Sequence, residues 1–109
     1  MKTSSAKAKG RNLQKWVRDI ILEKFSGLEP DDVRSTSMGA GGEDVQLSPA
    51  ARKHFPFSVE CKNVEKLNVW GAYEQAEANS GDHEPILIMK KNRKKPLIVI
   101  DAEAFFKLL

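Results

Sequence analysis

Apolar residues recur at intervals of three and four positions in the first quarter of the chain, beginning after Arg11. The stripe is made of Leu13, Trp16, Val17, Ile20, Ile21 and Phe25. Such spacing is typical of the buried face of an amphipathic helix. Gly27 ends the helix, because glycine readily adopts the conformation that follows a helix C-terminus. Residues 1–10 are small and basic and lack this periodicity, so we expect a flexible basic arm there.

The middle of the chain alternates polar and apolar positions, which predicts strands. We expect short strands at residues 32–37 and 43–47, separated by a glycine-rich stretch at residues 38–42 that does not suit a regular element. A helical turn at residues 50–54 follows. The alternation is cleanest at residues 57–62. There Phe57, Val59 and Cys61 point to one face of the strand, and Ser58, Glu60 and Lys62 to the other.

The second half of the chain has the composition of a helix at residues 67–79. Apolar strands at residues 86–89 and 97–100 are joined by the basic segment 90–95, which predicts a hairpin with a charged tip. A last helix is expected at residues 102–109. Its apolar side chains either complete the core or form an interface with a second copy; they are Phe105, Phe106, Leu108 and Leu109.

The predicted order is helix, three strands, helix, two strands, helix, which indicates an α/β domain with a central mixed sheet flanked by helices. A chain of 109 residues has room for one modest core. We therefore expect residues 11–109 to form a single domain. A content of 40% hydrophobic and 30% charged residues is typical of a globular protein.

Several protein classes do not fit this sequence. A single cysteine, Cys61, forms no intramolecular disulfide and has no partner at zinc-site spacing. The run from Gly39 to Gly42 lacks the following Lys-Ser or Lys-Thr of a phosphate-binding loop, so we expect no nucleotide cofactor. There is neither an apolar run of about 20 residues nor the apolar stretch of a secretory signal. We expect a cytoplasmic protein without a membrane partner.

Positive charge is concentrated in three places, although the net charge is only +3. One reading is a tail and a turn kept soluble by lysines. Three clusters in one small domain favour the other reading, contact with the phosphates of a nucleic acid. The residues that we expect at that interface are Lys9, Arg11, Arg52, Lys53, Lys91, Arg93, Lys94 and Lys95.

Two carboxylates and a lysine form the constellation with the clearest chemistry. Asp44 and Glu60 lie on neighbouring predicted strands, and oxygen ligands of this kind hold Mg²⁺. Lys62 follows Glu60 by two residues and therefore shares its strand face. An ammonium there can orient water and stabilise charge on a phosphodiester, while a metal ion lowers the pKa of the water. A Glu-x-Lys triplet alone is more often a solvated strand face.

The assembly around the triplet is more specific. An acidic residue at the start of a strand (Gly41-Gly42-Glu43-Asp44-Val45), a Glu-x-Lys strand (Phe57-Ser58-Val59-Glu60-Cys61-Lys62) and a following helix resemble the PD-(D/E)XK nuclease superfamily. The resemblance covers residues 11–100 and implies a restriction-endonuclease-like αβββαβ core. The small size and basic start are similar to the Holliday junction resolvases of archaea and their phage relatives.

The resemblance implies roles for particular residues. Asp44 and Glu60 would be metal ligands together with the backbone carbonyl of Cys61, and Lys62 would be the catalytic lysine. The superfamily often has a glutamate in the first helix, and here the matching position holds Gln14, which brings no charge. The usual proline before Asp44 is replaced by Glu43, which either adds charge to the metal site or points to solvent. Gln75 either lies beside the active site or is an exposed helix residue.

The expected function is a Mg²⁺-dependent endodeoxyribonuclease, with Mn²⁺ as a substitute metal, that resolves four-way DNA junctions as a homodimer. If the gene is from a phage, the enzyme would act in the host cytoplasm. Two alternatives remain: a general duplex or single-strand nuclease of repair or recombination, and a binding module that keeps only the fold.

Overall fold

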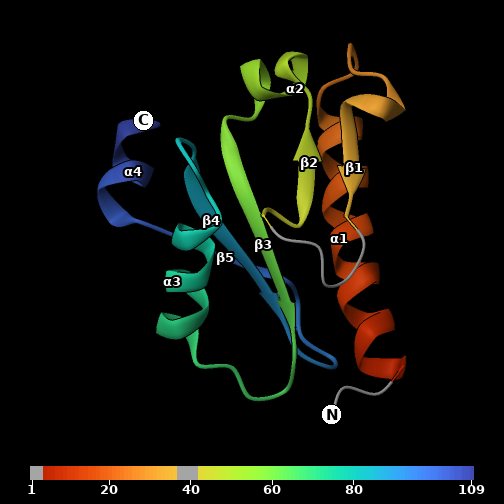
Figure 1. Ribbon diagram of the computed structural model, residues 1–109, viewed down its shortest axis with the longest axis vertical. Coiled ribbons are helices and arrows are strands. Elements are labelled where there is room, and N and C mark those ends of the chain that lie inside the picture. Colours follow the sequence, from red (N-terminus) through yellow and green to blue (C-terminus); the bar gives the residue numbers. More distant parts are fainter. Residues whose placement is uncertain (1–3, 37–41) are drawn as a thin grey trace.

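The computed structural model describes residues 4–36 and 42–109 (Figure 1). In chain order, the elements are α1 (Ser4–Lys24), the 3₁₀ turn η1 (Pro30–Asp32), β1 (Val33–Ser35), β2 (Val45–Leu47), α2 (Pro49–His54), β3 (Phe57–Asn63), α3 (Val69–Ala78), β4 (Glu84–Lys90), β5 (Leu97–Ile100) and α4 (Ala102–Lys107). The predicted glycine-rich stretch lies, except for Gly42, outside the described residues.

The strands form one five-stranded sheet in the order β1-β2-β3-β4-β5. The pairing of β3 with β4 is parallel, and the other neighbours are antiparallel. A parallel pair needs a crossover connection, and α3 supplies it. The prediction of an α/β domain with a mixed sheet and flanking helices is confirmed.

Helices cover both faces of the sheet (Figure 1). Leu13, Val17 and Ile21 of α1 pack into one core with sheet residues that include Val59 and Cys61. On the opposite face α3 contacts β3 and β4 through its buried Ala72 and Ala76. Small side chains at these two positions let the helix lie close to the sheet. Both faces of β3 are consequently buried over most of its length.

The prediction of a flexible arm at residues 1–10 is wrong for its described part, because α1 begins at Ser4. Residues such as Ala6, Lys7 and Ala8 have high helix propensity, which extends the helix without any apolar stripe. The buried face of α1 is also narrower than expected. Trp16 and Ile20 are 45% and 42% exposed and flank the core instead of joining it.

Strands β1 and β2 are only three residues long, shorter than the predicted spans. Asp32 anchors the entry to β1, because its carboxylate accepts hydrogen bonds from the Ser48 hydroxyl at 2.6 Å and from the Glu29 backbone at 2.8 Å. These bonds, chiefly that from Ser48, hold the pKa of Asp32 below its ordinary value. In the described part of the chain, no helix is both long and apolar enough to cross a lipid bilayer.

Candidate active site

Asp44 is fixed against the centre of β3. It directly precedes β2, where Val45 pairs with Val59 of β3. The Asp44 backbone N–H donates to the Val59 carbonyl at 2.8 Å, and its carboxylate Oδ2 accepts from the Cys61 backbone N–H at 2.7 Å. Asp44 is thus bonded to the main chain of both neighbours of Glu60, Val59 and Cys61. Its carboxylate is therefore held next to Glu60.

Glu60 is a buried carboxylate with two polar neighbours. Its side chain lies on the α3 side of the sheet, opposite Val59 and Cys61, and the residue is 4% exposed. The Asn79 amide at the end of α3 donates to Glu60 Oε1 at 3.3 Å, and Lys62 Nζ lies 3.6 Å from Oε2. Asn79 and Lys62 therefore approach different oxygens of one carboxylate.

The electrostatics of the site are those of a crowded acidic pair. Burial raises the pKa of Glu60 above its ordinary value, and the negative charge of Asp44 adds to the effect. The bond from Asn79 and the charge of Lys62 act in the opposite direction. The two carboxylates are thus close enough to sense each other, and one ammonium only partly compensates them.

A hard divalent cation fits this donor set. Two carboxylates from adjacent chain segments supply oxygen ligands, and a cation between them would relieve the repulsion that raises the Glu60 pKa. Among the described residues, no group of three or more His, Cys, Asp or Glu side chains could hold a metal ion. Further ligands would have to be amide or backbone oxygen, water or substrate phosphate, which suits Mg²⁺ because it retains several water ligands.

Comparison with known proteins places the chain in a family. A family model described as phage putative PDDEXK endonuclease matches residues 5–109, nearly the whole chain. The chain belongs to this family. It is therefore a member of the PD-(D/E)XK nuclease superfamily, as its sequence motifs suggested. No curated protein and no solved structure matches it.

Gln14 lies on the buried face of α1, beside Leu13, and is 3% exposed. This face packs against β1, β2 and β3. The predicted orientation of Gln14 toward the sheet is therefore correct. A neutral amide occupies this buried position, and its role toward a metal stays a prediction.

Glu43 has a partner other than a metal. Its carboxylate forms an ion pair with Arg52 of α2, and both side chains are mostly buried. Arg52 also donates to the Phe57 backbone carbonyl at 2.8 Å. The guanidinium thus links Glu43 to the start of β3. The expectation that Glu43 points to solvent is wrong, because Arg52 draws its carboxylate into the protein.

The thiol of Cys61 packs in the core beneath the site. Burial raises its pKa, and the charges of Asp44 and Glu60 raise it further. Both effects disfavour the thiolate, so the side chain is a small apolar group, as its strand face predicted.

Of two polar residues in and at the end of α3, the sequence indicated Gln75 but not Asn79. Gln75 is exposed, and it lies one helical turn before Asn79, on the same side of the helix. Sequence analysis missed Asn79, because an asparagine just before Ser80 and Gly81 looks like a simple helix end. Its bond to Glu60 joins residues 19 positions apart, and no local pattern signals such a contact.

The basic residues occupy two ends of the sheet. Arg52 and Lys53 belong to α2, just before β3 begins. The hairpin at residues 91–96 instead follows Lys90, which pairs with Asn63 where β3 ends. Strand β3 spans about 20 Å at about 3.3 Å per residue. The three basic clusters of the sequence therefore do not form one patch (Figure 1).

The N-terminal part of α1 lies at the same end as the hairpin. The Lys9 carbonyl accepts a hydrogen bond from the Asn63 side chain at 3.2 Å. Four lysines of the hairpin region also line a shallow groove beside Val64 and Met89; they are Lys90, Lys91, Lys94 and Lys95. Lys62 projects near this end of β3, so the basic surface adjoins the Asp44 and Glu60 pair.

Proposed function

We propose that this chain is a Mg²⁺-dependent DNA endonuclease whose active site consists of Asp44, Glu60 and Lys62. The observation that carries the proposal is the clustering of these three side chains on β3 and the start of β2. Lys62 Nζ lies 3.6 Å from a Glu60 carboxylate that is almost fully buried. Burial, and then the Asp44 charge, raise the pKa of that carboxylate. A domain that only bound DNA would gain nothing from two neighbouring carboxylates, one of them buried, because they repel phosphate.

Each residue has a distinct task in phosphodiester hydrolysis. Asp44 and Glu60 would hold the cation, which when bound lowers the pKa of water and neutralises phosphate charge. Asn79 positions the Glu60 carboxylate through its amide. Lys62 would place an ammonium beside the attacking water and the phosphate. Such a preorganised cation stabilises the negative charge of the transition state more than that of the ground state.

The path of the DNA follows from the charge distribution. The substrate phosphate would lie at Lys62, and the flanking backbone would run toward Lys9 and Arg11 of α1 and the basic hairpin. Asn63 ties the end of β3 to α1, so this end of the molecule is one continuous surface. Arg52 is held by Glu43 and is not available to phosphate, while Lys53 at the far end would contact only a longer or branched substrate.

We infer further that the preferred substrate is a four-way junction, cut by a homodimer. The small size of the domain and its basic N-terminal residues are similar to the junction resolvases. An isologous dimer has two-fold symmetry and presents two equivalent sites, which matches a junction with two symmetric strands to cut. As a member of a phage family, the enzyme would meet such junctions in the host cytoplasm.

The test is cleavage of a substrate panel with Mg²⁺ and with Mn²⁺, using an immobile four-way junction, a duplex of the same arm sequence and its single strand. Paired nicks at symmetric positions of the junction, with little cutting of the other two, are expected. Equal cutting of duplex or single strand would replace the resolvase by a general nuclease. If neither metal supports cleavage of any substrate, the nuclease proposal itself fails.

A further inference from the structure

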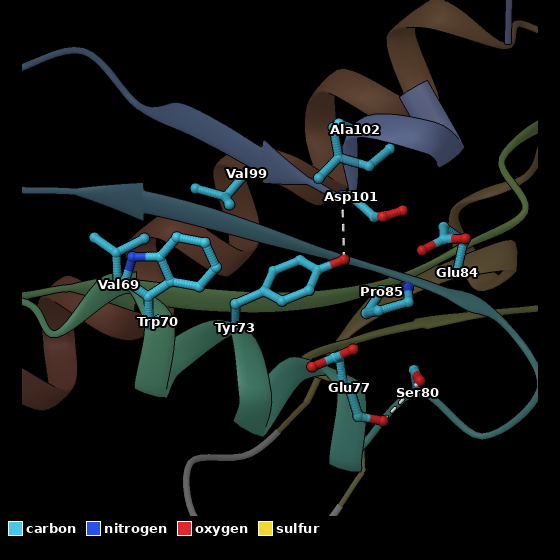
Figure 2. A pocket seen from close by; sticks show the side chains of 11 residues that line it. Val69, Trp70, Tyr73, Glu77, Ser80, Glu84, Pro85, Val99, Asp101 and Ala102 are labelled. Atoms are coloured by element: carbon cyan, nitrogen blue, oxygen red, sulfur yellow. Dashed lines mark hydrogen bonds between the residues drawn. The ribbon is translucent and has the colours of Figure 1, made fainter. Parts of the chain in front are cut away.

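A groove between α3 and α4 leaves apolar side chains uncovered. It has a volume of about 830 Å³, and its walls come from α3, β4, β5 and α4. Figure 2 shows the rings of Trp70 and Tyr73 along one wall, Val99 of β5 beside them, and Glu77 and Glu84 toward the other end. Trp70 is 82% exposed, which is costly for the largest apolar side chain unless a partner covers it.

Helix α4 stands beside this groove without filling it. Its first residue, Ala102, lines the groove, and positions three and four residues later lie on the same helix face. Those positions are Phe105 and Phe106, and Leu109 follows the end of the helix. All three are exposed, Phe106 to 69%. The apolar stripe of α4 therefore does not complete the core of its own chain.

The base of α4 is nonetheless held in place. Asp101 caps the helix by accepting from the Ala104 backbone N–H, and its own backbone N–H donates to the Tyr73 hydroxyl at 3.2 Å (Figure 2). Tyr73 thus ties the start of α4 to α3. The orientation of the helix is set before any partner arrives, so little ordering entropy opposes docking.

We propose that a second copy of this chain covers the groove, with the apolar stripe of each α4 packed against Trp70 of the other. A groove and a complementary helix side by side on one surface are what an isologous two-fold interface requires. This surface would be the interface of the homodimer in the proposed function, and to that extent the inference rests on the proposed function.

The exposed apolar area approaches what such an interface needs. A fully exposed aromatic side chain presents about 150–250 Å², and leucine somewhat less. At their exposed fractions, the apolar side chains of α4 and Trp70 leave on the order of 600 Å² in solvent. The groove walls add to this, and a standard interface buries about 800 Å² per partner.

Charge favours a protein partner over nucleic acid. Glu77, Glu84 and Asp101 line the groove and would repel phosphate. Helix α4 carries one exposed carboxylate, Glu103, and one exposed ammonium, Lys107, so the α4 of a second copy adds no net negative charge to the acidic rim. Val69 at the start of α3 lines both this groove and the lysine-lined groove of the hairpin, so DNA and the second copy would use adjoining surfaces.

The test is the molar mass of the full chain by light scattering on a sizing column, which needs no cleavage and so can fail independently of the nuclease assay. We expect a dimer for the wild type and for Trp16→Glu, which alters an exposed tryptophan on the opposite face. Trp70→Glu and Phe106→Glu should each give a folded monomer, with circular dichroism as the check. A monomeric wild type, or dimers that survive both groove variants, would overturn the proposal.

A second measurement covers the case in which the glutamate variants do not fold. Chains carrying only Trp70→Cys are mixed with chains carrying only Phe106→Cys and oxidised. Because the native Cys61 is buried, the introduced thiols dominate. The mixed disulfide should exceed either homodisulfide several-fold, and a statistical mixture would contradict the reciprocal packing.

Discussion

Removal of the Asn79 amide tests whether Glu60 is positioned for metal binding. Asn79→Ala deletes the donor to Glu60 Oε1 but keeps the backbone bond from Asn79 to the Gln75 carbonyl, so α3 keeps its end. A hydrogen bond to a charged group contributes about 1.5–3 kcal/mol. The observed 3.3 Å is long, which places this one at the lower limit.

About 1.5 kcal/mol corresponds to roughly a tenfold effect, within the 10–100-fold range for partners that orient metal ligands. We expect the Mg²⁺ concentration for half-maximal cleavage to rise by about that factor, and the rate at saturating metal to fall less. The assay is single-turnover cleavage across a Mg²⁺ titration. It separates weaker metal binding from slower chemistry, since only the former is rescued by more metal.

Asn68→Ala is the matched control. Asn68 caps the other end of α3, where its side chain accepts from the Gly71 backbone N–H. Its loss costs about 1 kcal/mol of helix stability without touching Glu60. If both variants shift the Mg²⁺ requirement equally, the effect of Asn79 is general destabilisation and the positioning role is refuted.

Three further predictions concern the surface and the framework. The double change Lys94→Ala and Lys95→Ala should reduce the salt slope of DNA binding by about 2 and leave the saturated rate intact, and an unchanged slope would remove the hairpin from the DNA surface. Arg52→Ala and Glu43→Gln should each lower stability by about 2 kcal/mol in thermal melts, with no additivity in the double variant; a changed metal requirement for Glu43→Gln alone would instead make Glu43 a ligand. Asp32→Asn should lower the melting temperature at neutral pH. Hydrogen bonds, chiefly that from the Ser48 hydroxyl, lower the pKa of Asp32 in the folded state. The contribution of the Asp32 carboxylate to folding stability is therefore fully present above the unfolded-state pKa near 3.8. It is lost as the pH falls through the lower folded-state pKa. A melting difference that stays undiminished as the pH falls would contradict this origin.

Most of the helices and strands could be predicted from the periodicity of apolar residues. The alternation along β3 placed Val59 and Cys61 in the core and Glu60 and Lys62 on the other face, and the structure agrees. Alternation is a local property, because successive side chains of a strand point to opposite faces wherever the strand lies. The first residue of α1 could not be predicted in this way, because the first turns of the helix are polar and have no repeated apolar positions.

Contacts between residues far apart in the chain could not be predicted from the sequence. Asn79 meets Glu60, and Arg52 meets Glu43, only because the crossover helix and the short α2 bring them together. Arg52 looked like a free phosphate ligand because a pattern of charges does not disclose which of them form internal pairs. The exposure of α4 likewise depends on where Tyr73 anchors it, which no spacing encodes.

The most direct test of the active site is the single-turnover rate of DNA cleavage in saturating Mg²⁺ for the wild type, Asp44→Asn, Glu60→Gln and Lys62→Ala. These nearly isosteric or truncating changes remove charge, and melts and DNA affinity at equilibrium serve as controls for folding and binding. Loss of a group that stabilises the transition state costs about 100- to 1,000-fold, so we predict rates at least 100-fold lower for all three. Wild-type rates in the Asp44 and Lys62 variants would contradict the assignment of this site.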